Sequence, residues 1–247
     1  MEKLIELLTD GDRDCQWYAA MALGRIGGTN AVFELVSALH SNEEDVRRCA
    51  ALALGVTRDV RAIRPLIESL GDHNRDVRLE AVKALAKIGA PAVGPLVARL
   101  MGPCDGRIEE LLAEALSKIG GPAIGPLMDY LENATPEIRK KAVITLGVAG
   151  DRRAVIPLIM RLKDEDYDVR KAAIIALGKI GDREAVKYLI GCLSDPYPSI
   201  RGKAAWALGK IGDPAAIDPL IQCIEDENLD VIYEANRALN CLSWNKL

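Results

Sequence analysis

The apolar positions of this chain recur with a fixed period from one end to the other. Each copy of the pattern opens on a Val, Ile or Cys, found at Cys15, Val46, Val77, Ile108, Ile138, Val169, Ile200 and Val231. These positions are 31 residues apart, except that the step from Ile108 to Ile138 is shorter by a single residue. Self-similarity at such a period is typical of repeat proteins, in which each copy is one supersecondary unit. The pattern therefore predicts one elongated domain over residues 1–247, built from eight copies.

Each copy predicts two helices. In the copy that contains Val169, apolar residues follow at i+4 and i+8, which is the spacing of one helix face. Gly181 then offers a left-handed helix end, and a second apolar stretch with i, i+3, i+4, i+7 spacing starts at Val186. We expect helical pairs at approximately 1–27, 28–58, 59–89, 90–120, 121–150, 151–181, 182–212 and 213–247.

Glycine and proline add two expectations. Glycine inside the first helix, as at Gly147, Gly178 and Gly209, costs roughly 1 kcal/mol against alanine, so close approach of a neighbouring helix should offset it. Proline near the start of the second helix should mark its first turns, where a missing N–H costs least. These prolines are Pro65, Pro95, Pro126, Pro157 and Pro219.

The motif V-R-x-x-A-A-x-A-L-G-x-I-G-D, as in Val169 to Asp182, together with P-L-I-x-x-L, as in Pro157 to Leu162, resembles the HEAT-like repeats of the phycobilisome-lyase type. The resemblance covers all eight copies. It implies an all-α, right-handed α-solenoid, a superhelix of eight two-helix repeats. It further implies that the P-L-I helix lies on the convex side and the V-R-x-x-A-A helix on the concave side.

The resemblance also implies that an Asp six residues before the Arg helps to tie the turn. The pairs Asp72 with Arg78, Asp164 with Arg170 and Asp195 with Arg201 match, Asn133 with Arg139 is a near match, and Ser41 with Arg47 is weaker. Two terminal copies and the fourth copy lack the Arg. In the fourth copy Pro103 and Glu109 replace the Asp and the Arg. We expect a weaker or more bent joint at residues 101–109, although a tolerated loop variant explains the same residues.

Composition supports a helical repeat with an aliphatic core. Hydrophobic residues make up 49% of the chain, aromatic residues only 4%, and the net charge is −4.

The six cysteines form no C-x-x-C pair, and residues 1–8 read as an amphipathic helix without a signal sequence, so we expect free thiols and a cytoplasmic location. No run is long enough to span a membrane. The copies are regular enough to suggest a consensus-derived sequence, but the irregular fourth copy favours a natural one.

Because buried positions repeat, information about partners should lie in the positions that vary. Offsets 3, 6 and 10 from the repeated Val should form one exposed stripe on the concave helix. From this stripe and Trp17 beside it we select a partner-binding set: Trp17, Tyr18, Met21, Leu52, Val56, Lys83, Lys87, Lys118, Lys141, Ile144, Val148, Ile175, Lys179, Lys203, Trp206 and Lys210.

The stripe predicts a groove with two apolar patches and a surplus of positive charge. Contiguous exposed apolar surface usually marks a protein-binding site, although packing of these side chains on one another across adjacent copies explains the same pattern. An acidic protein segment or a nucleic-acid backbone would be attracted to the lysines, although lysine also serves simply to keep a helix solvated. The scarcity of stacking aromatics favours protein.

Residues with recognisable chemistry are scarce. The two histidines, His40 and His73, belong to no metal-binding motif, and there is no phosphate-binding loop and no nucleophile with an evident base. We therefore predict no catalytic residues, no metal and no cofactor. The leading hypothesis is a non-catalytic scaffold that binds a protein or peptide in its concave groove. The alternatives are a bilin lyase-like or chromophore-handling subunit, which the resemblance implies, and nucleic-acid binding through the lysines.

Overall fold

The computed structural model describes residues 2–10 and 12–244, and every regular element in these ranges is a helix. The α-helices are α1 (Glu2–Asp10), α2 (Arg13–Ile26), α3 (Gly28–Ala38), α4 (Glu44–Thr57), α5 (Ile63–Glu68), α6 (Arg75–Ile88), α7 (Ala90–Met101), α8 (Gly106–Ile119), α9 (Gly121–Met128), α10 (Pro136–Ala149), α11 (Val155–Met160), α12 (Tyr167–Ile180), α13 (Val186–Gly191), α14 (Pro198–Ile211), α15 (Ile217–Gln222) and α16 (Leu229–Trp244).

Four odd-numbered helices, α5, α11, α13 and α15, are shorter than the apolar pattern predicts, because a 3₁₀ turn stands at each end. These turns are η1 (Val60–Ala62), η2 (Ser69–Gly71), η3 (Arg152–Ala154), η4 (Arg161–Lys163), η5 (Arg183–Ala185), η6 (Cys192–Ser194), η7 (Pro214–Ala216) and η8 (Cys223–Glu225). An Asp before each leading turn starts it: the Asp151 side chain, for example, accepts the backbone N–H of Arg153 at 2.9 Å.

The expectation that every proline marks a first turn is wrong for Pro95 and Pro126. Both lie inside their helices, α7 and α9. The reason is that α7 and α9 begin directly after Gly89 and Gly120, with no 3₁₀ turn to delay the start of the α-helix. Pro157, by contrast, is the third residue of α11, where the absent N–H costs little.

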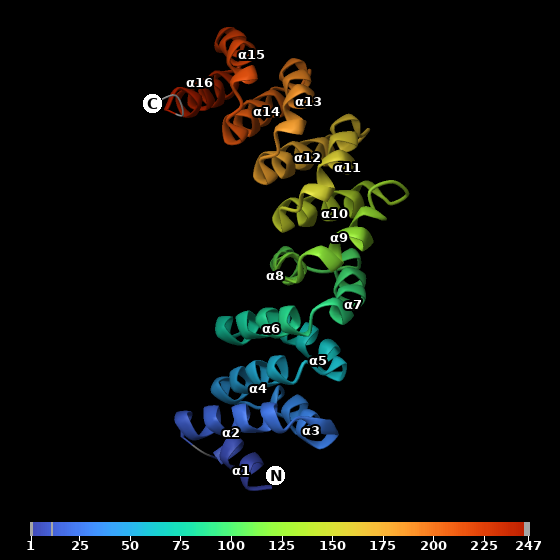
Figure 1. Cartoon of the computed structure of the whole chain (residues 1–247), viewed down its shortest axis with the longest axis vertical. Helices are drawn as coiled ribbons and strands as arrows, with labels where there is room; N and C mark the ends of the chain where they lie inside the picture. Colours follow the sequence, from blue (N-terminus) through green and yellow to red (C-terminus); the bar gives the residue numbers. More distant parts are fainter. Residues whose placement is uncertain (1, 11, 245–247) are drawn as a thin grey trace. The chain divides into compact units, whose positions relative to one another are not determined.

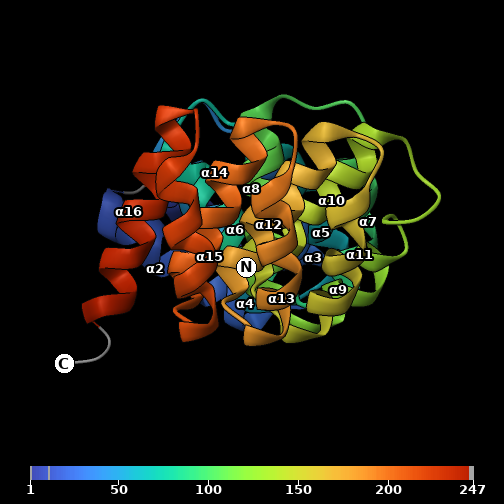
Figure 2. The same ribbon diagram turned by 90° about the horizontal axis from the view of Figure 1, so that it is seen from above.

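Contacts divide the chain into two compact units, Met1–Pro126 and Leu127–Leu247. In the first unit α2, α4, α6 and α8 form one row, with α3, α5 and α7 in a second layer (Figure 1). In the second unit α10, α12, α14 and α16 pack side by side, and Figure 2 shows α11, α13 and α15 in a separate layer. The predicted fold class, an all-α solenoid of two-helix HEAT-like repeats, is confirmed. Whether residues 1–247 form a single domain stays a prediction.

Small residues set the distance between neighbouring even-numbered helices. A Cβ atom added to Gly147 of α10 would lie 2.6 Å from the Cβ of Ala176 in α12, closer than packed atoms approach. The same relation joins Gly55 to Ala84, Gly178 to Ala207 and Gly209 to Ala238. The expected close approach of a neighbouring helix is therefore confirmed, since each of these glycines faces an alanine of the next copy.

Replacing Gly147 by alanine should destabilise the protein by about 1–3 kcal/mol, because the added methyl group forces α10 and α12 apart. This cost should outweigh the gain of roughly 1 kcal/mol in helix propensity. Urea denaturation followed by circular dichroism measures the change. Gly191→Ala is the matched control, because that exposed glycine at the end of α13 has nothing near its Cβ position. Equal effects of the two changes would show that Gly147 does not set the helix spacing.

Arginine and aspartate side chains join successive copies. Arg139 of α10 donates from Nε and Nη2 to the two carboxylate oxygens of Asp164 at 3.0 and 2.7 Å, and Asp164 belongs to the next copy. Nη1 of Arg139 donates to the backbone carbonyl of Ala134 in its own turn at 2.8 Å. The same bidentate bridge joins Arg47 to Asp72 and Arg201 to Asp226. We call these inter-copy ion pairs the Arg–Asp ladder.

The Asp six residues before the Arg helps to tie the turn, as the resemblance implies, and it receives that Arg at its backbone carbonyl. Arg170 does not bind the carboxylate of Asp164; its Nη1 donates to the Asp164 backbone carbonyl at 2.9 Å. The carboxylate instead caps the backbone N–H of Asp166 at 3.0 Å and receives Arg139. Asp164 therefore stabilises its own turn through its backbone carbonyl and its carboxylate, and the same carboxylate also binds the preceding copy.

The residues that form the Arg–Asp ladder and the Gly–Ala contacts are missing between α6 and α8, where the fourth copy begins. Arg47 reaches Asp72 of the following copy, but the position that corresponds to Asp72 in the copy after Arg78 holds Pro103, which has no carboxylate. Ala86 in α6 occupies the position that Gly147 occupies in α10. Neither the Arg–Asp ladder nor the glycine contact is available here. The weaker joint expected at residues 101–109 stays a prediction, and the boundary between the two units falls later in the chain, after Pro126.

Candidate binding surface

One surface of the second unit carries large apolar side chains that water reaches. Ile144 on α10 is 43% exposed, and Ile175 on α12 and Trp206 on α14 are half-buried. The three residues occupy equivalent positions of successive copies. They therefore form one row that runs across α10, α12 and α14, and we call it the apolar row.

Lysines flank the apolar row because the sequence places one three or four residues before each apolar residue and, for Ile175 and Trp206, another four residues after it, which is one helical turn. The first lysine row consists of Lys140, Lys171 and Lys203, and the second consists of Lys179 and Lys210. All five lysine side chains are exposed or half-buried.

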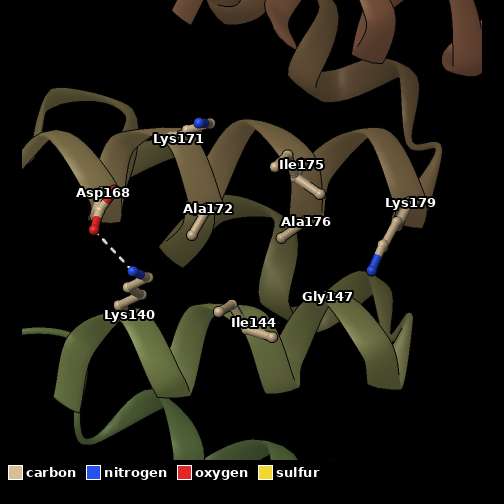
Figure 3. Close-up of a pocket in the computed structure, with 9 residues that line it drawn as sticks. All are labelled: Lys140, Ile144, Gly147, Asp168, Lys171, Ala172, Ile175, Ala176 and Lys179. Atoms are coloured by element: carbon tan, nitrogen blue, oxygen red, sulfur yellow. Dashed lines mark hydrogen bonds and ion pairs between the residues drawn. The ribbon is translucent and has the colours of Figure 1, made fainter. Parts of the chain in front are cut away.

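A hollow of about 270 Å³ lies between α10 and α12. Ile144 and Ile175 line its middle, and Ala172, Ala176 and Gly147 complete its wall. Figure 3 shows Lys140 and Asp168 at one end of the hollow and Lys179 at the other. The hollow thus offers an apolar centre between charged ends.

The lysines differ in how far neighbouring groups neutralise them. Lys140 is paired with Asp168 at 2.8 Å, and this contact holds the pKa of the Asp168 carboxyl below its ordinary value. Lys203 lies 3.8 Å from Glu234. Lys179 and Lys210 have no carboxylate within ion-pair distance in the part of the chain that the structure describes. The second lysine row therefore carries uncompensated charge.

Trp206 is less available than the sequence suggests. Its ring covers Gly178 of the preceding copy, since a Cβ added there would lie 2.8 Å from Cζ3 of the indole. A second, small hollow of about 40 Å³ lies beside Trp206, lined by Lys210, Glu234 and Arg237 among others. The alternative that such side chains pack across adjacent copies therefore holds in part for Trp206.

The expectation that offset 3 is exposed is wrong at three positions. Lys141 is only 9% exposed, and its ammonium lies 3.6 Å from the Glu137 carboxylate. Cys49 and Ala172, at the same offset, are also buried. Offset 3 turns toward the neighbouring helix because the Gly–Ala contacts draw the helices close together. Val148, at offset 10 on α10, is 40% exposed, as expected.

The other predicted residues lie in the first unit. Trp17 and Tyr18 of α2 are exposed and stack edge to face with ring centroids 5.0 Å apart, while Met21 is half-buried. Leu52 and Val56 of α4 are half-buried. Lys83, Lys87 and Lys118 are exposed or half-buried, but Lys83 is paired with Glu80 at 2.8 Å and Lys118 with Glu114 at 3.5 Å. The positive surplus expected here is therefore partly neutralised.

Sequence reasoning missed Lys140, Lys171 and Asp168. All three line the hollow, but they stand at offsets 2 and −1 and so outside the chosen stripe. The signal that could have found them is the i, i+4 spacing from Lys140 to Ile144 and from Lys171 to Ile175.

The described residues contain no cluster of three or more His, Cys, Asp or Glu that could hold a metal ion. All six cysteines are free, and burial raises the pKa of the Cys192 thiol to about 11, so this thiol is protonated at neutral pH. Among residues 2–10 and 12–244, no helix is long and apolar enough to cross a membrane.

A family model for HEAT repeats matches residues 1–78, 34–117, 63–147, 95–171 and 155–240. These matches overlap and extend over nearly the whole sequence. The chain therefore belongs to the HEAT-repeat family. The narrower phycobilisome-lyase type is not confirmed by this match. No curated protein matches the sequence at a significant level.

Several solved structures are similar to this chain. Kap95p, from a study of its binding to RanGDP, is 14% identical with a TM-score of 0.56 over 98% of this chain and 40% of its own. Human deoxyhypusine hydroxylase is 23% identical with a TM-score of 0.45, over 98% and 96% of the two chains. The CpcE and CpcF complex of phycocyanin lyase from Nostoc is 23% identical with a TM-score of 0.41, over 98% and 94%. Identities this low show the fold alone.

Proposed function

We propose that this chain is a non-catalytic interaction scaffold that binds a segment of a partner protein on the apolar row and the lysine rows. The observation that carries the proposal is the hollow of about 270 Å³ between α10 and α12, where Ile144 and Ile175 line a wall that water reaches. Contiguous exposed apolar surface with a polar rim is characteristic of protein-binding sites.

The proposal assigns the two isoleucines of the apolar row to binding because other residues supply the core of the same helices. The core of the same helices is supplied by Leu146, Leu177 and Leu208, each with no exposed surface. The isoleucines of the apolar row stand on the other side of the helices and leave the hollow between them. The six free thiols suit a reducing compartment, and we place the scaffold in the cytoplasm.

The paired change Ile144→Glu and Ile175→Glu should reduce recovery of the partner by at least about 10-fold, because two carboxylates replace the apolar centre of the site. The measurement is affinity capture from a lysate of the source organism, with proteins identified by mass spectrometry. Trp206 is left intact, because its ring also packs over Gly178.

The matched control is Ile156→Glu with Ile221→Glu. These isoleucines on α11 and α15 are 50% and 51% exposed, so the same chemistry is introduced in the odd-numbered layer. A partner lost equally from both variants, or retained by both, contradicts the assignment of binding to the apolar row. A bilin lyase-like role stays a prediction from the resemblance, and bilin absorbance of the protein purified from its source tests it.

A further inference from the structure

We infer that the partner segment is acidic and carries apolar side chains between its carboxylates. The inference rests on the proposed binding function and adds the chemistry of the occupant. It follows from which charges surround the apolar row, which of them are already neutralised, and how far apart they stand.

The surface around the apolar row has a surplus of positive charge, although the whole chain carries −4. Three acidic residues, Asp168, Asp230 and Glu234, line its hollows and the neighbouring one. Six basic residues line the same hollows and the neighbouring one: Lys140, Lys171, Lys179, Lys203, Lys210 and Arg237. Positive charge is therefore gathered at the place where apolar surface is also exposed.

Two of the three carboxylates, Asp168 and Glu234, are already engaged in ion pairs. Asp168 pairs with Lys140 at 2.8 Å, and Glu234 lies 3.8 Å from both Lys203 and Arg237. Lys171, Lys179 and Lys210 have no carboxylate within ion-pair distance among the described residues; Lys171 lies over the Tyr167 ring instead, 5.7 Å from its centroid. Carboxylates of an incoming segment would supply the missing counter-charges and speed its encounter.

The spacing suits an extended segment that crosses the helices. Neighbouring packed helices are about 10 Å apart, a distance that an extended chain covers in about three residues. Lys171 and Lys179 stand two turns apart on α12, roughly 12 Å along the helix, with Ile175 between them. A segment along the apolar row would therefore place an apolar side chain at about every third residue and carboxylates on both sides.

Nucleic acid fits the same lysines less well. Single-stranded nucleic acid binds through bases stacked on aromatic rings, and the apolar row offers one ring, Trp206, which is half-buried over Gly178. Ile144 and Ile175 would face a charged sugar-phosphate backbone, with which aliphatic side chains make no favourable contact. The combination of exposed aliphatic and basic side chains is matched by an acidic, partly apolar peptide.

The test is selection of peptides from a random phage-displayed library against the immobilised full chain. Sequences enriched by the wild type should contain Asp or Glu on both sides of Leu, Ile, Phe or Trp. One selected peptide is then synthesised, and its Kd is measured by fluorescence anisotropy. The triple change Lys171→Gln, Lys179→Gln and Lys210→Gln should raise that Kd by about 10-fold or more, and added salt should weaken wild-type binding by screening.

The matched control removes the same charge elsewhere in the second unit, by Lys163→Gln, Arg183→Gln and Lys187→Gln in η4, η5 and α13. It should change the Kd by no more than about 2-fold, because exposed charges away from the site contribute little. Circular dichroism of each variant confirms that it is folded. An equal effect of the two triple changes would show an attraction to overall charge and overturn the inference.

The remaining outcomes separate this inference from the proposed function. Selected peptides without acidic enrichment whose binding is still lost with Ile144→Glu and Ile175→Glu would overturn the acidic partner and leave the scaffold standing. Binding of random-sequence duplex DNA that is lost with the three lysine changes and kept with the isoleucine changes would overturn the acidic segment in favour of nucleic acid. If no peptide is selected, the inference is also overturned. Failure of lysate capture would count against the scaffold itself.

Discussion

Replacing Asp164 by alanine is expected to lower the free energy of unfolding by about 3–5 kcal/mol, because it leaves the buried Arg139 guanidinium with only the exposed Glu165 carboxylate, 3.3 Å away, as a counter-charge. The Asp164 side chain is 2% exposed and that of Arg139 is 8% exposed. Two hydrogen bonds join them, and a third connects the carboxylate to the backbone N–H of Asp166. Urea denaturation followed by circular dichroism measures the loss.

The control is Asp168→Ala, which removes the exposed pair with Lys140 in the same copy. Both side chains of that pair are about half exposed, so its loss should cost no more than about 1 kcal/mol. A loss from Asp164→Ala no larger than that from Asp168→Ala would show that the Arg–Asp ladder does not stabilise the stack. The double change Arg139→Met and Asp164→Leu should recover much of the loss, since apolar side chains then replace both members of the bidentate pair.

The effect of Asp164→Ala should also depend on pH. Burial alone would raise the pKa of the Asp164 carboxyl. The hydrogen bonds from Arg139 and from the Asp166 N–H outweigh this effect, so the pKa of Asp164 lies below its ordinary value. A depressed native pKa gives stability that is present above the unfolded pKa of about 3.9 and is lost as the pH falls through the native pKa. The difference between wild type and Asp164→Ala should thus be constant near neutral pH and shrink below about pH 4.

Replacing Leu177 by alanine is expected to cost about 2–5 kcal/mol of unfolding free energy. Leu177 is completely buried in α12, between the row of even-numbered helices and the odd-numbered layer. The change removes its apolar contacts and leaves a cavity that close-packed neighbours fill only in part. Urea denaturation again gives the value.

Leu229→Ala is the matched control for Leu177→Ala. Leu229 is the first residue of α16 and is 81% exposed, so the same truncation should change stability by no more than about 0.5 kcal/mol. A small effect at both positions would contradict the division of α12 into a buried Leu177 side and an accessible Ile175 side. That division is what allows the apolar row to be tested without unfolding the protein.

The repeat pattern predicted the fold because burial recurs with the sequence period. Leu146, Leu177 and Leu208 stand one repeat period apart, and all three are fully buried. Glycine at offset 9 predicted the close helix approach for the same reason. The Arg–Asp ladder was not predicted, because an aspartate stands in the arginine's own turn and another in the turn of the following copy. Only the geometry decides which carboxylate its guanidinium reaches.

The candidate surface was predicted less completely than the core. Offset 6 was correctly placed on an accessible side, as Ile144 shows, but offset 3 turned inward and buried Lys141. A modest rotation about the helix axis separates an exposed lysine from a buried one, and the periodicity does not determine that rotation.

The Arg–Asp ladder repeats with the sequence period, so a copy that carries it can be removed while the contacts between its neighbours are formed again. Arg139 pairs with Asp164, and Asp195 follows Asp164 by one repeat period. If residues 151–181 were removed, Asp195 would take the place that Asp164 now has after Arg139, and Gly147 would face Ala207 where it now faces Ala176. Both contacts would be rebuilt from residues already present. Such a chain can gain or lose whole copies during evolution without inventing a new interface, and each copy gained lengthens the surface available to a partner.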